Sequence, residues 1–180
     1  MTLRLSVENG PYRDLDRPRV RRRIQAMLSL LQLKEAELSV VFSNDDQLHQ
    51  LNKAYRGKDK PTDVLAFPMR EGDFARLHAS LPSSMLGDVI VSVPTAVRQA
   101  KAAKRPPLEE ITMLVAHGLL HLLGWDHDTK AKDRAMRAET DRLCEHATKV
   151  ERKPAKKSRA RAASKTDSKT RTKRGSRSSS

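Results

Sequence analysis

The chain has 180 residues and a formal net charge of +14, and only 3% of its residues are aromatic. This length suits one domain with a substantial core. The single cysteine, Cys144, excludes an intramolecular disulfide framework, so we expect a reducing compartment, the cytoplasm. No apolar run has the length of a secretion signal or a bilayer span, and we expect no membrane association.

The predicted elements alternate between strands and helices before ending in three helices. Strands are indicated by short apolar or alternating runs, and helices by apolar residues at helical spacing. In chain order they are a strand at Leu3–Val7, a helix at Arg19–Leu31, a strand at Glu37–Phe42, a helix from Ser43 to Arg56, a turn at 57–61, a strand at Asp63–Phe67, a long loop at Arg70–Ser84, a strand at Asp88–Val93, and helices at Pro94–Lys104, Leu108–Leu123 and Lys130–Thr148.

The helix that ends at Arg56 carries a start signal and an apolar face. Ser43-x-x-Asp46 is an analogue of a capping box, which predicts the first turn at this point. Leu48, Leu51 and Tyr55 recur at helical spacing, so we expect all three to face inward. Arg56 then lies at the exposed end of the helix.

Together these elements predict a mixed α/β fold in a single domain. We expect a small, mostly parallel or mixed four-stranded sheet with about five helices packed over it. The helix Leu108–Leu123 is apolar on most sides and should therefore be central.

The positive charge is concentrated near the C-terminal end. Residues 153–177 contain eleven Lys or Arg against one acid, Asp167, a net +10 that leaves +4 for the rest. Residues 153–180 contain nothing large and apolar, so burial cannot offset their ordering entropy. We predict a folded domain at 1–152 and a disordered basic tail at 153–180. Such arms bind phosphate backbones through counterion release, although a merely solvated tail has the same composition.

Three of the six histidines fall within eleven residues. His117 and His121 are four apart, so on a helix both imidazoles lie on one face. Gly124 is suited to the left-handed conformation that ends a helix and would bring His127 back as a third ligand. Three nitrogen ligands leave one tetrahedral position open, which is typical of a catalytic zinc. We predict a metal centre, with two buried core histidines as the plainer alternative.

The residue after the first histidine separates this site from zinc peptidases. Those enzymes carry a glutamate there, which acts as the general base. Here the residue is Gly118, which supplies no proton acceptor, so a Lewis-acid site remains without the base for peptide hydrolysis.

Three sequence blocks carry a family resemblance. The run H-G-L-L-H-L-L-G-W-D-H at 117–127 closely resembles the signature of the YbeY family of bacterial rRNA maturation endoribonucleases. The segment from Leu51 to Pro68 resembles a second block of that family, and Leu86–Ser92 a third. The resemblance covers about residues 1 to 150. One departure is Ala66, where the family commonly has serine.

The resemblance implies a function and roles for single residues. It implies a single-strand-specific, metal-dependent endoribonuclease that matures the 3′ end of small-subunit rRNA and acts in ribosome biogenesis or quality control. His117, His121 and His127 would hold one zinc ion per chain on the central helix. His117 and Arg56 would be catalytic, with Arg56 facing the metal across the cleft and contacting RNA. The implied partners are the small ribosomal subunit, one of its proteins and an assembly GTPase.

Some assignments stay open in the sequence. A non-catalytic, zinc-containing ribosome assembly factor that binds RNA is the main alternative, and a peptidase with an unusual base is a weaker one. No general base is identifiable, so either water or the RNA 2′-hydroxyl could attack. Asp126 is equally a partner of an imidazole N–H or a turn residue. Lys58, Asp59 and Asp63 fit an RNA contact or proton transfer, with Lys58 the candidate for the RNA contact, and turn polarity explains all three equally. The sequence does not indicate an oligomeric state.

The remaining histidines and one methionine are expected to be structural or superficial. His49, His78 and His146 lack ligand spacing, so we expect them at the surface. Met136 should belong to the core.

Overall fold

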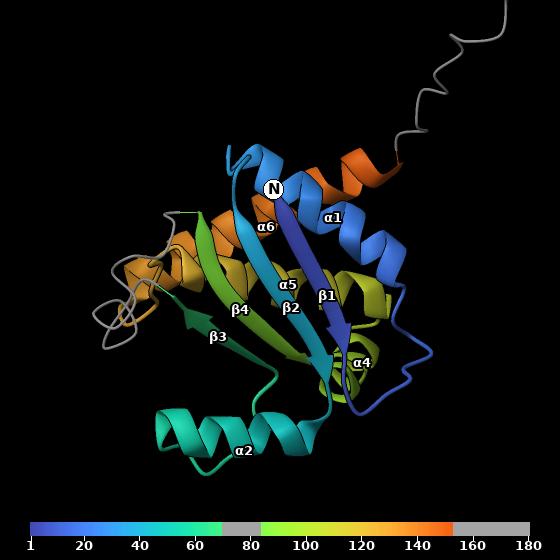
Figure 1. The fold of residues 1–180 in the computed structure, drawn as a ribbon, viewed down its shortest axis with the longest axis vertical. Helices are drawn as coiled ribbons and strands as arrows, with labels where there is room; N and C mark the ends of the chain where they lie inside the picture. The colour runs from blue at the N-terminus through green and yellow to red at the C-terminus, as the bar shows by residue number, and fades with distance from the viewer. Residues whose placement is uncertain (70–83, 153–180) are drawn as a thin grey trace, which may run out of the picture.

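The computed structural model describes residues 1–69 and 84–152. Figure 1 shows their arrangement. The elements are β1 (Thr2–Val7), α1 (Arg17–Leu30), β2 (Glu37–Ser43), α2 (Asp45–Arg56), β3 (Val64–Pro68), β4 (Met85–Ser92), α4 (Val93–Ala102), α5 (Pro107–Leu122) and α6 (Lys130–Arg152). The predicted loop at 70–83 and the predicted tail at 153–180 lie outside the described residues.

The four strands form one mixed sheet in the order β1-β2-β4-β3. β1, β2 and β4 run parallel, and β3 pairs antiparallel with β4 at the edge. The expected single-domain α/β fold with a four-stranded sheet and five helices is therefore confirmed for the described residues.

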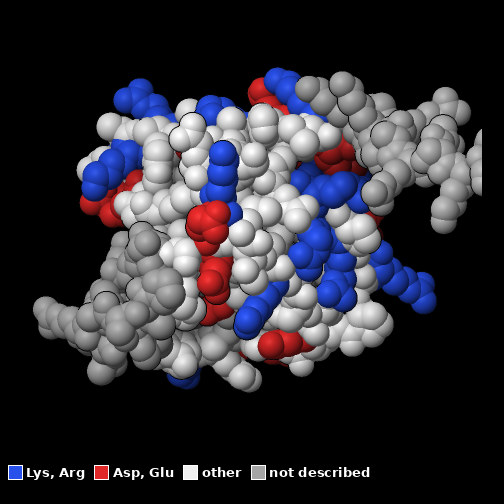
Figure 2. All heavy atoms as spheres, turned by 45° about the horizontal axis from the view of Figure 1, so that its top comes forward, with Lys and Arg blue, Asp and Glu red and all other residues white. Residues whose placement is uncertain are grey.

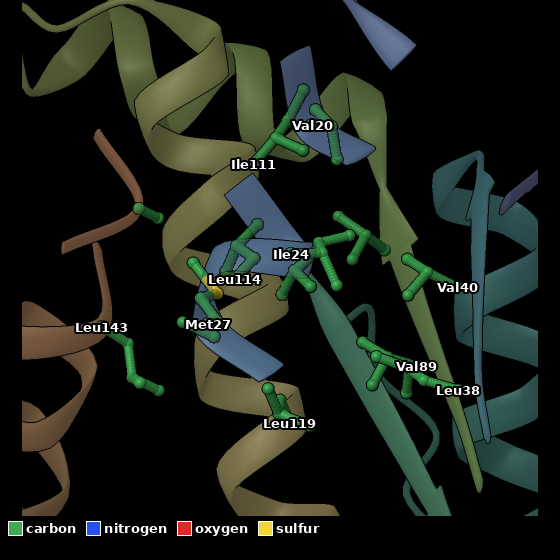
Figure 3. Packing of buried hydrophobic residues seen from close by; sticks show 14 of the residues in the cluster. Val20, Ile24, Met27, Leu38, Val40, Val89, Ile111, Leu114, Leu119 and Leu143 are labelled. Atoms are coloured by element: carbon green, nitrogen blue, oxygen red, sulfur yellow. The ribbon is translucent and has the colours of Figure 1, made fainter. Parts of the chain in front are cut away.

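One face of the sheet carries the core. Alternate residues of β2, among them Leu38 and Val40, are buried, and Val89 of β4 pairs with Val40 on the same face. Side chains of α1 and α5 meet these strands, with Leu143 of α6 behind them (Figure 3). α5 is buried along most of its length, as its all-round apolarity predicted.

Two arginines of α1 cover the free edge of β1. The guanidinium groups of Arg17 and Arg21 donate to the carbonyl oxygens of Leu5 and Leu3, at 3.0 and 2.9 Å. In the parallel pairing with β2 these carbonyls point away from the partner strand. The arginines therefore satisfy acceptors that an unprotected edge would offer to another chain.

The same helix is clamped to the end of α6. Glu151 accepts from Arg19 Nε at 2.8 Å and from Arg23 at 3.4 Å, and its side chain is only 8% exposed. Arg23 also donates to Thr112 of α5 at 3.1 Å. The carboxylate of Glu151 thus joins α6 to α1, and Arg23 links this pair of helices to α5 through Thr112. Figure 2 shows one face of the molecule, on which basic side chains gather toward one side.

α2 is fixed at its first turn, and its start differs from the prediction. Asn44, not Ser43, is the N-cap, accepting from the Gln47 N–H at 3.0 Å. Ser43 is instead the last residue of β2, because the strand extends one residue further than its apolar pattern. Asp45 accepts from Thr95 at 2.6 Å and Arg98 at 2.8 Å, which ties α2 to α4.

Three other expectations are corrected. Tyr55 was expected to face inward, yet it is 67% exposed, while Leu48 of the same helix is fully buried. The buried face of α2 is narrower than the spacing of its apolar residues suggested, because α2 crosses the end of the sheet instead of lying along it (Figure 1). β4 begins at Met85, three residues before the predicted start, and Gly87 continues the pairing with Pro68. β3 continues through Pro68, where the strand was expected to stop.

The residues expected outside the site have mixed positions. Met136 is buried, as predicted. The His49 side chain is 40% exposed and pairs with Asp59, and His146 is half-buried, less exposed than expected. His78 lies outside the described residues. In the described ranges, no helix is both long enough and apolar enough to cross a bilayer.

Candidate metal centre

The last two turns of α5 bring two imidazoles to one point. His117 Nε2 and His121 Nε2 lie 3.2 Å apart, as the four-residue spacing predicts. The ring of His127 lies 5.7 Å from that of His117 and 5.2 Å from that of His121, between centroids. One ligand nitrogen from each histidine falls within 4.8 Å of the others. The structure therefore brings together the three histidines that the sequence predicted.

Gly124 makes this convergence possible. Its φ is +83°, in the left-handed region that glycine adopts without steric cost. Its N–H donates to the His121 carbonyl at 3.0 Å, and the Trp125 N–H donates to the Leu120 carbonyl at 3.0 Å. These bonds close the helix end and reverse the chain. His127 returns from beyond the turn for this reason.

A main-chain atom fixes the ring of His121. Its Nδ1 lies 3.0 Å from the carbonyl oxygen of Trp125. A carbonyl only accepts, so Nδ1 carries the proton and Nε2 presents its lone pair to the other histidines. Asp126 accepts from the His127 main-chain N–H at 2.7 Å, so of its two interpretations the structure supports the turn.

Burial keeps His117 and His121 uncharged. The pKa of His117 is lowered to about 4, mainly by burial and also by the neighbouring His121 and His127, whose positive charge would oppose its protonation. Burial also lowers the pKa of His121, with a contribution from His127. Both rings are therefore neutral at pH 7, and neutral imidazole is the form that binds a metal ion. The described residues can hold a metal ion here, and the donor set is three nitrogens.

The structure explains why residue 118 is glycine. A Cβ built on Gly118 would lie 2.6 Å from Val89 Cγ1 and 3.3 Å from Val64 Cγ2. Both valines belong to the sheet, and Val89 is fully buried. α5 thus approaches β3 and β4 too closely for any side chain at this position. A glutamate base could not be accommodated here without moving the helix.

Two hollows meet at the histidines. The larger has a volume of about 1220 Å³ and includes Arg56, Lys58, His121 and His127 in its lining. The smaller, of about 670 Å³, includes all three histidines together with Arg56. The cluster is therefore reachable from two sides, and Arg56 lines both.

Arg56 reaches the cluster from another part of the sequence. It is the last residue of α2, and Gly57, with φ +65°, ends the helix. Arg56 contributes to the lowered pKa of His121, which places its charge near that ring. Arg56 therefore lines the same hollows as the histidines. Lys58 follows on the exposed side of the turn.

The two aspartates that the sequence left open are both engaged elsewhere. Asp59 accepts from His49 at 2.8 Å and pairs with Lys53 at 2.7 Å. Asp63 accepts from the Val64 N–H and, at 2.9 Å, from Gln99 Nε2, although it lines the smaller hollow. Neither carboxylate forms a hydrogen bond with the histidines in the described part of the chain.

Sequence reasoning missed the contribution of Trp125. Its carbonyl orients His121, and its side chain lines the larger hollow, 38% exposed. The only signal was its position directly after the helix-ending Gly124, where a main-chain carbonyl turns back toward the last helical turn.

The mixed sheet and the three-histidine cluster at the end of the central helix α5 identify the chain as a small α/β protein with a candidate metal centre. The chain belongs to the YbeY family: the family model described as Endoribonuclease YbeY matches residues 8–148.

Proteins named Endoribonuclease YbeY resemble the chain over most of their length. The protein from Syntrophus aciditrophicus is 35% identical over 71% of this chain and 78% of its own length. That from Anaeromyxobacter is 42% identical over 76% of this chain and 67% of its own length. The solution structure of a Thermotoga maritima protein has a TM-score of 0.55 at 20% identity, covering 88% of this chain and all of that one, which shows the shared fold.

Proposed function

We propose that this protein is a zinc-dependent endoribonuclease that cleaves single-stranded RNA during maturation of the 3′ end of small-subunit rRNA. The observation that carries the proposal is the convergence of three histidines and Arg56 on one hollow. Membership of a family whose named members are endoribonucleases supplies the reaction class. The proposed setting is the cytoplasm, in ribosome biogenesis or quality control.

Zinc is the proposed ion because three imidazole nitrogens in a partly buried site suit it, and one ion per chain fits the single cluster found in the described residues. When bound, zinc would polarise the scissile phosphate and lower the pKa of a water molecule.

The chain's own residues would position and stabilise the substrate. His117, His121 and His127 would hold the ion, with the Trp125 carbonyl setting the ring of His121. The guanidinium of Arg56 would brace the phosphoryl oxygens, because its planar donors match a phosphate and stabilise charge that develops in the transition state. Lys58, at the rim of the larger hollow, would bind a neighbouring phosphate.

The peptidase alternative loses support from the structure. Gly118 is packed against Val89 and Val64, so the helix position that carries the base in zinc peptidases has no side chain here. Metal-dependent cleavage of casein, lost in His117→Ala, would restore it.

A non-catalytic assembly factor that uses zinc to order an RNA-binding cleft is the remaining alternative. We also propose contacts with a small-subunit ribosomal protein and an assembly GTPase, which are compatible with either function.

A single-turnover assay on a short single-stranded rRNA fragment separates the two. Wild type should cleave the fragment, while His117→Ala and Arg56→Glu should be strongly impaired, with metal content retained in Arg56→Glu. Arg4→Glu is a charge-matched control, because Arg4 is exposed on β1, at the opposite edge of the sheet from β3. Binding without cleavage by metal-loaded wild type would favour the assembly factor.

The same assay decides how the phosphodiester is attacked. A 2′-O-methyl group at the scissile nucleotide should abolish cleavage if the 2′-hydroxyl is the nucleophile. Cleavage should persist if water is the nucleophile.

A further inference from the structure

Two exposed aromatic side chains share the larger hollow with the basic residues. The large hydrophobic side chains exposed in the described part of the chain are Met1, Tyr55, Trp125 and Val150. Tyr55 and Trp125, which come from separate elements, both line the hollow that contains Arg56. A hollow of about 1220 Å³ exceeds the roughly 300–1,000 Å³ of small-molecule sites, so it has room for more than one nucleotide.

The fold does not account for the exposure of these rings. Tyr55 touches Phe67 edge-on, with centroids 5.4 Å apart and planes at 77°, and two thirds of the residue remains exposed. Trp125 is 38% exposed, and its main chain forms hydrogen bonds with Leu120 and His121. Both residues therefore leave part of an aromatic surface open to the hollow that they line.

Aromatic faces beside basic groups match the two chemical surfaces of a single-stranded nucleic acid. Unpaired bases stack on aromatic rings, while Arg and Lys bind the phosphates between them. A duplex hides its base faces, so such a surface selects unpaired RNA. The positive charge of Arg56 and Lys58 favours RNA over an apolar protein segment as the occupant.

We propose that Tyr55 and Trp125 are base-stacking surfaces for the unpaired nucleotides that flank the scissile phosphate, with Arg56 and Lys58 holding the phosphates between them. This inference rests on the proposed function and deepens it, because it places single-strand selectivity in two identified side chains. Stacking tolerates every base, so the preference is for unpaired rather than for particular nucleotides.

Trp125 provides its own probe, because it is the only tryptophan in the chain. Metal-loaded full-length protein is mixed with a short oligouridine in a stopped-flow instrument, and tryptophan fluorescence is followed before cleavage. We expect quenching by oligouridine. An abasic oligomer of the same length and a duplex carry the same phosphates without accessible base faces, and neither should quench.

Substitutions test the energetic contribution of each ring. Tyr55→Leu and Trp125→Leu should each weaken oligouridine binding about tenfold, the cost of losing one stacked base. Tyr55→Phe and Trp125→Phe keep an aromatic face and should bind nearly as wild type. Metal content should stay constant in the Trp125 variants, because the carbonyl that orients His121 remains. Val150→Ala shortens a side chain of α6 that is about as exposed as Trp125, and it should not change binding.

The outcomes are distinct. Equal quenching by the abasic oligomer, or unchanged affinity in both leucine variants, would overturn the stacking surface. Quenching by an apolar peptide but not by oligouridine would assign the hollow to a protein segment instead. Cleavage without quenching would refute this inference alone, whereas quenching without cleavage would refute the proposed catalytic function and leave the stacking surface in place.

Discussion

The orientation of the candidate ligands depends on single atoms contributed by their neighbours. The Trp125 carbonyl holds the Nδ1 proton of His121 and thereby frees Nε2 for the cluster. Gly124 supplies the left-handed turn that returns His127. The spacing of the histidines selects a helix face but does not set the orientation of the rings. Trp125 sets the ring of His121, and Gly124 brings His127 back to the cluster.

Removing one ligand should reduce metal binding sharply. His121→Ala leaves two imidazoles, which make a weak site, so we expect purified protein to fall from about one zinc per chain to far less. Metal content by mass spectrometry after dialysis measures this. His49→Ala removes a histidine outside the cluster and should keep the wild-type content. Full occupancy in His121→Ala would contradict the assignment of three ligands.

Gly118 should be intolerant of even a methyl group. In an exposed helix, Gly→Ala stabilises by about 1 kcal/mol. Here the added Cβ would meet Val89 at 2.6 Å, and overpacking of this kind costs about 1–3 kcal/mol. We therefore expect Gly118→Ala to lower the free energy of unfolding, measured by urea denaturation.

The double variant Gly118→Ala/Val89→Ala gives the matched control. Shortening Val89 removes the clash, so the two substitutions together should cost less than their separate effects added. A Gly118→Ala variant more stable than wild type would show that α5 is not held so closely against the sheet.

At the scale of elements, the end of α6 is held by a carboxylate with a strongly altered pKa. The hydrogen bond from Arg19, assisted by the charges of Arg19 and Arg23, lowers the pKa of Glu151 to about 2 from its usual 4.5. The folded state therefore binds fewer protons than the unfolded chain between these values. The stabilisation is fully present above pH 4.5 and is lost as the pH falls toward 2.

Glu151→Gln should destabilise the protein by about 1–2 kcal/mol at neutral pH, because the arginines lose a charged acceptor. The difference from wild type should shrink as the pH falls from 4.5 toward 2, which urea unfolding over this range measures. Glu145→Gln breaks an exposed pair with Lys149 and should cost little. Equal stabilities of Glu151→Gln and wild type at neutral pH would refute the clamp.

Most elements could be predicted from local patterns, and the failures have a common cause. Apolar periodicity located each described helix and strand within a few residues. The spacing of the three histidines predicted that they would come together. The predicted inward position of Tyr55 was wrong, because periodicity marks apolar residues as inward whether or not a neighbouring element covers them. The contacts of Arg17 and Arg21 with the edge of β1 were not predicted, since contacts between distant elements have no local signature.

At the scale of the whole molecule, most of the positive charge lies apart from the candidate ligands along the sequence. Residues 153–180 hold most of the net positive charge, and the candidate ligands all precede them. The clamp at Glu151 lies just before this segment, so a chain ending at Arg152 keeps every contact described for the fold.

Truncation after Arg152 should therefore weaken rRNA binding and flatten its dependence on salt, because fewer counterions are released. Metal content and cleavage position should not change. Binding measured over a range of salt concentrations for both chains gives the two slopes. Identical slopes would show that the tail is only solvated and that recognition resides in the hollow around Arg56.

We propose that three histidines hold one ion on which RNA cleavage depends. The decisive measurement is a titration of metal-stripped protein with zinc, in which the single-turnover cleavage rate of a single-stranded rRNA fragment is followed at each step. We predict negligible cleavage without metal and a rate that rises with occupancy until about one ion per chain is bound, with no such rise in His121→Ala. Full activity in the stripped protein, or an equal rise in His121→Ala, would contradict the account.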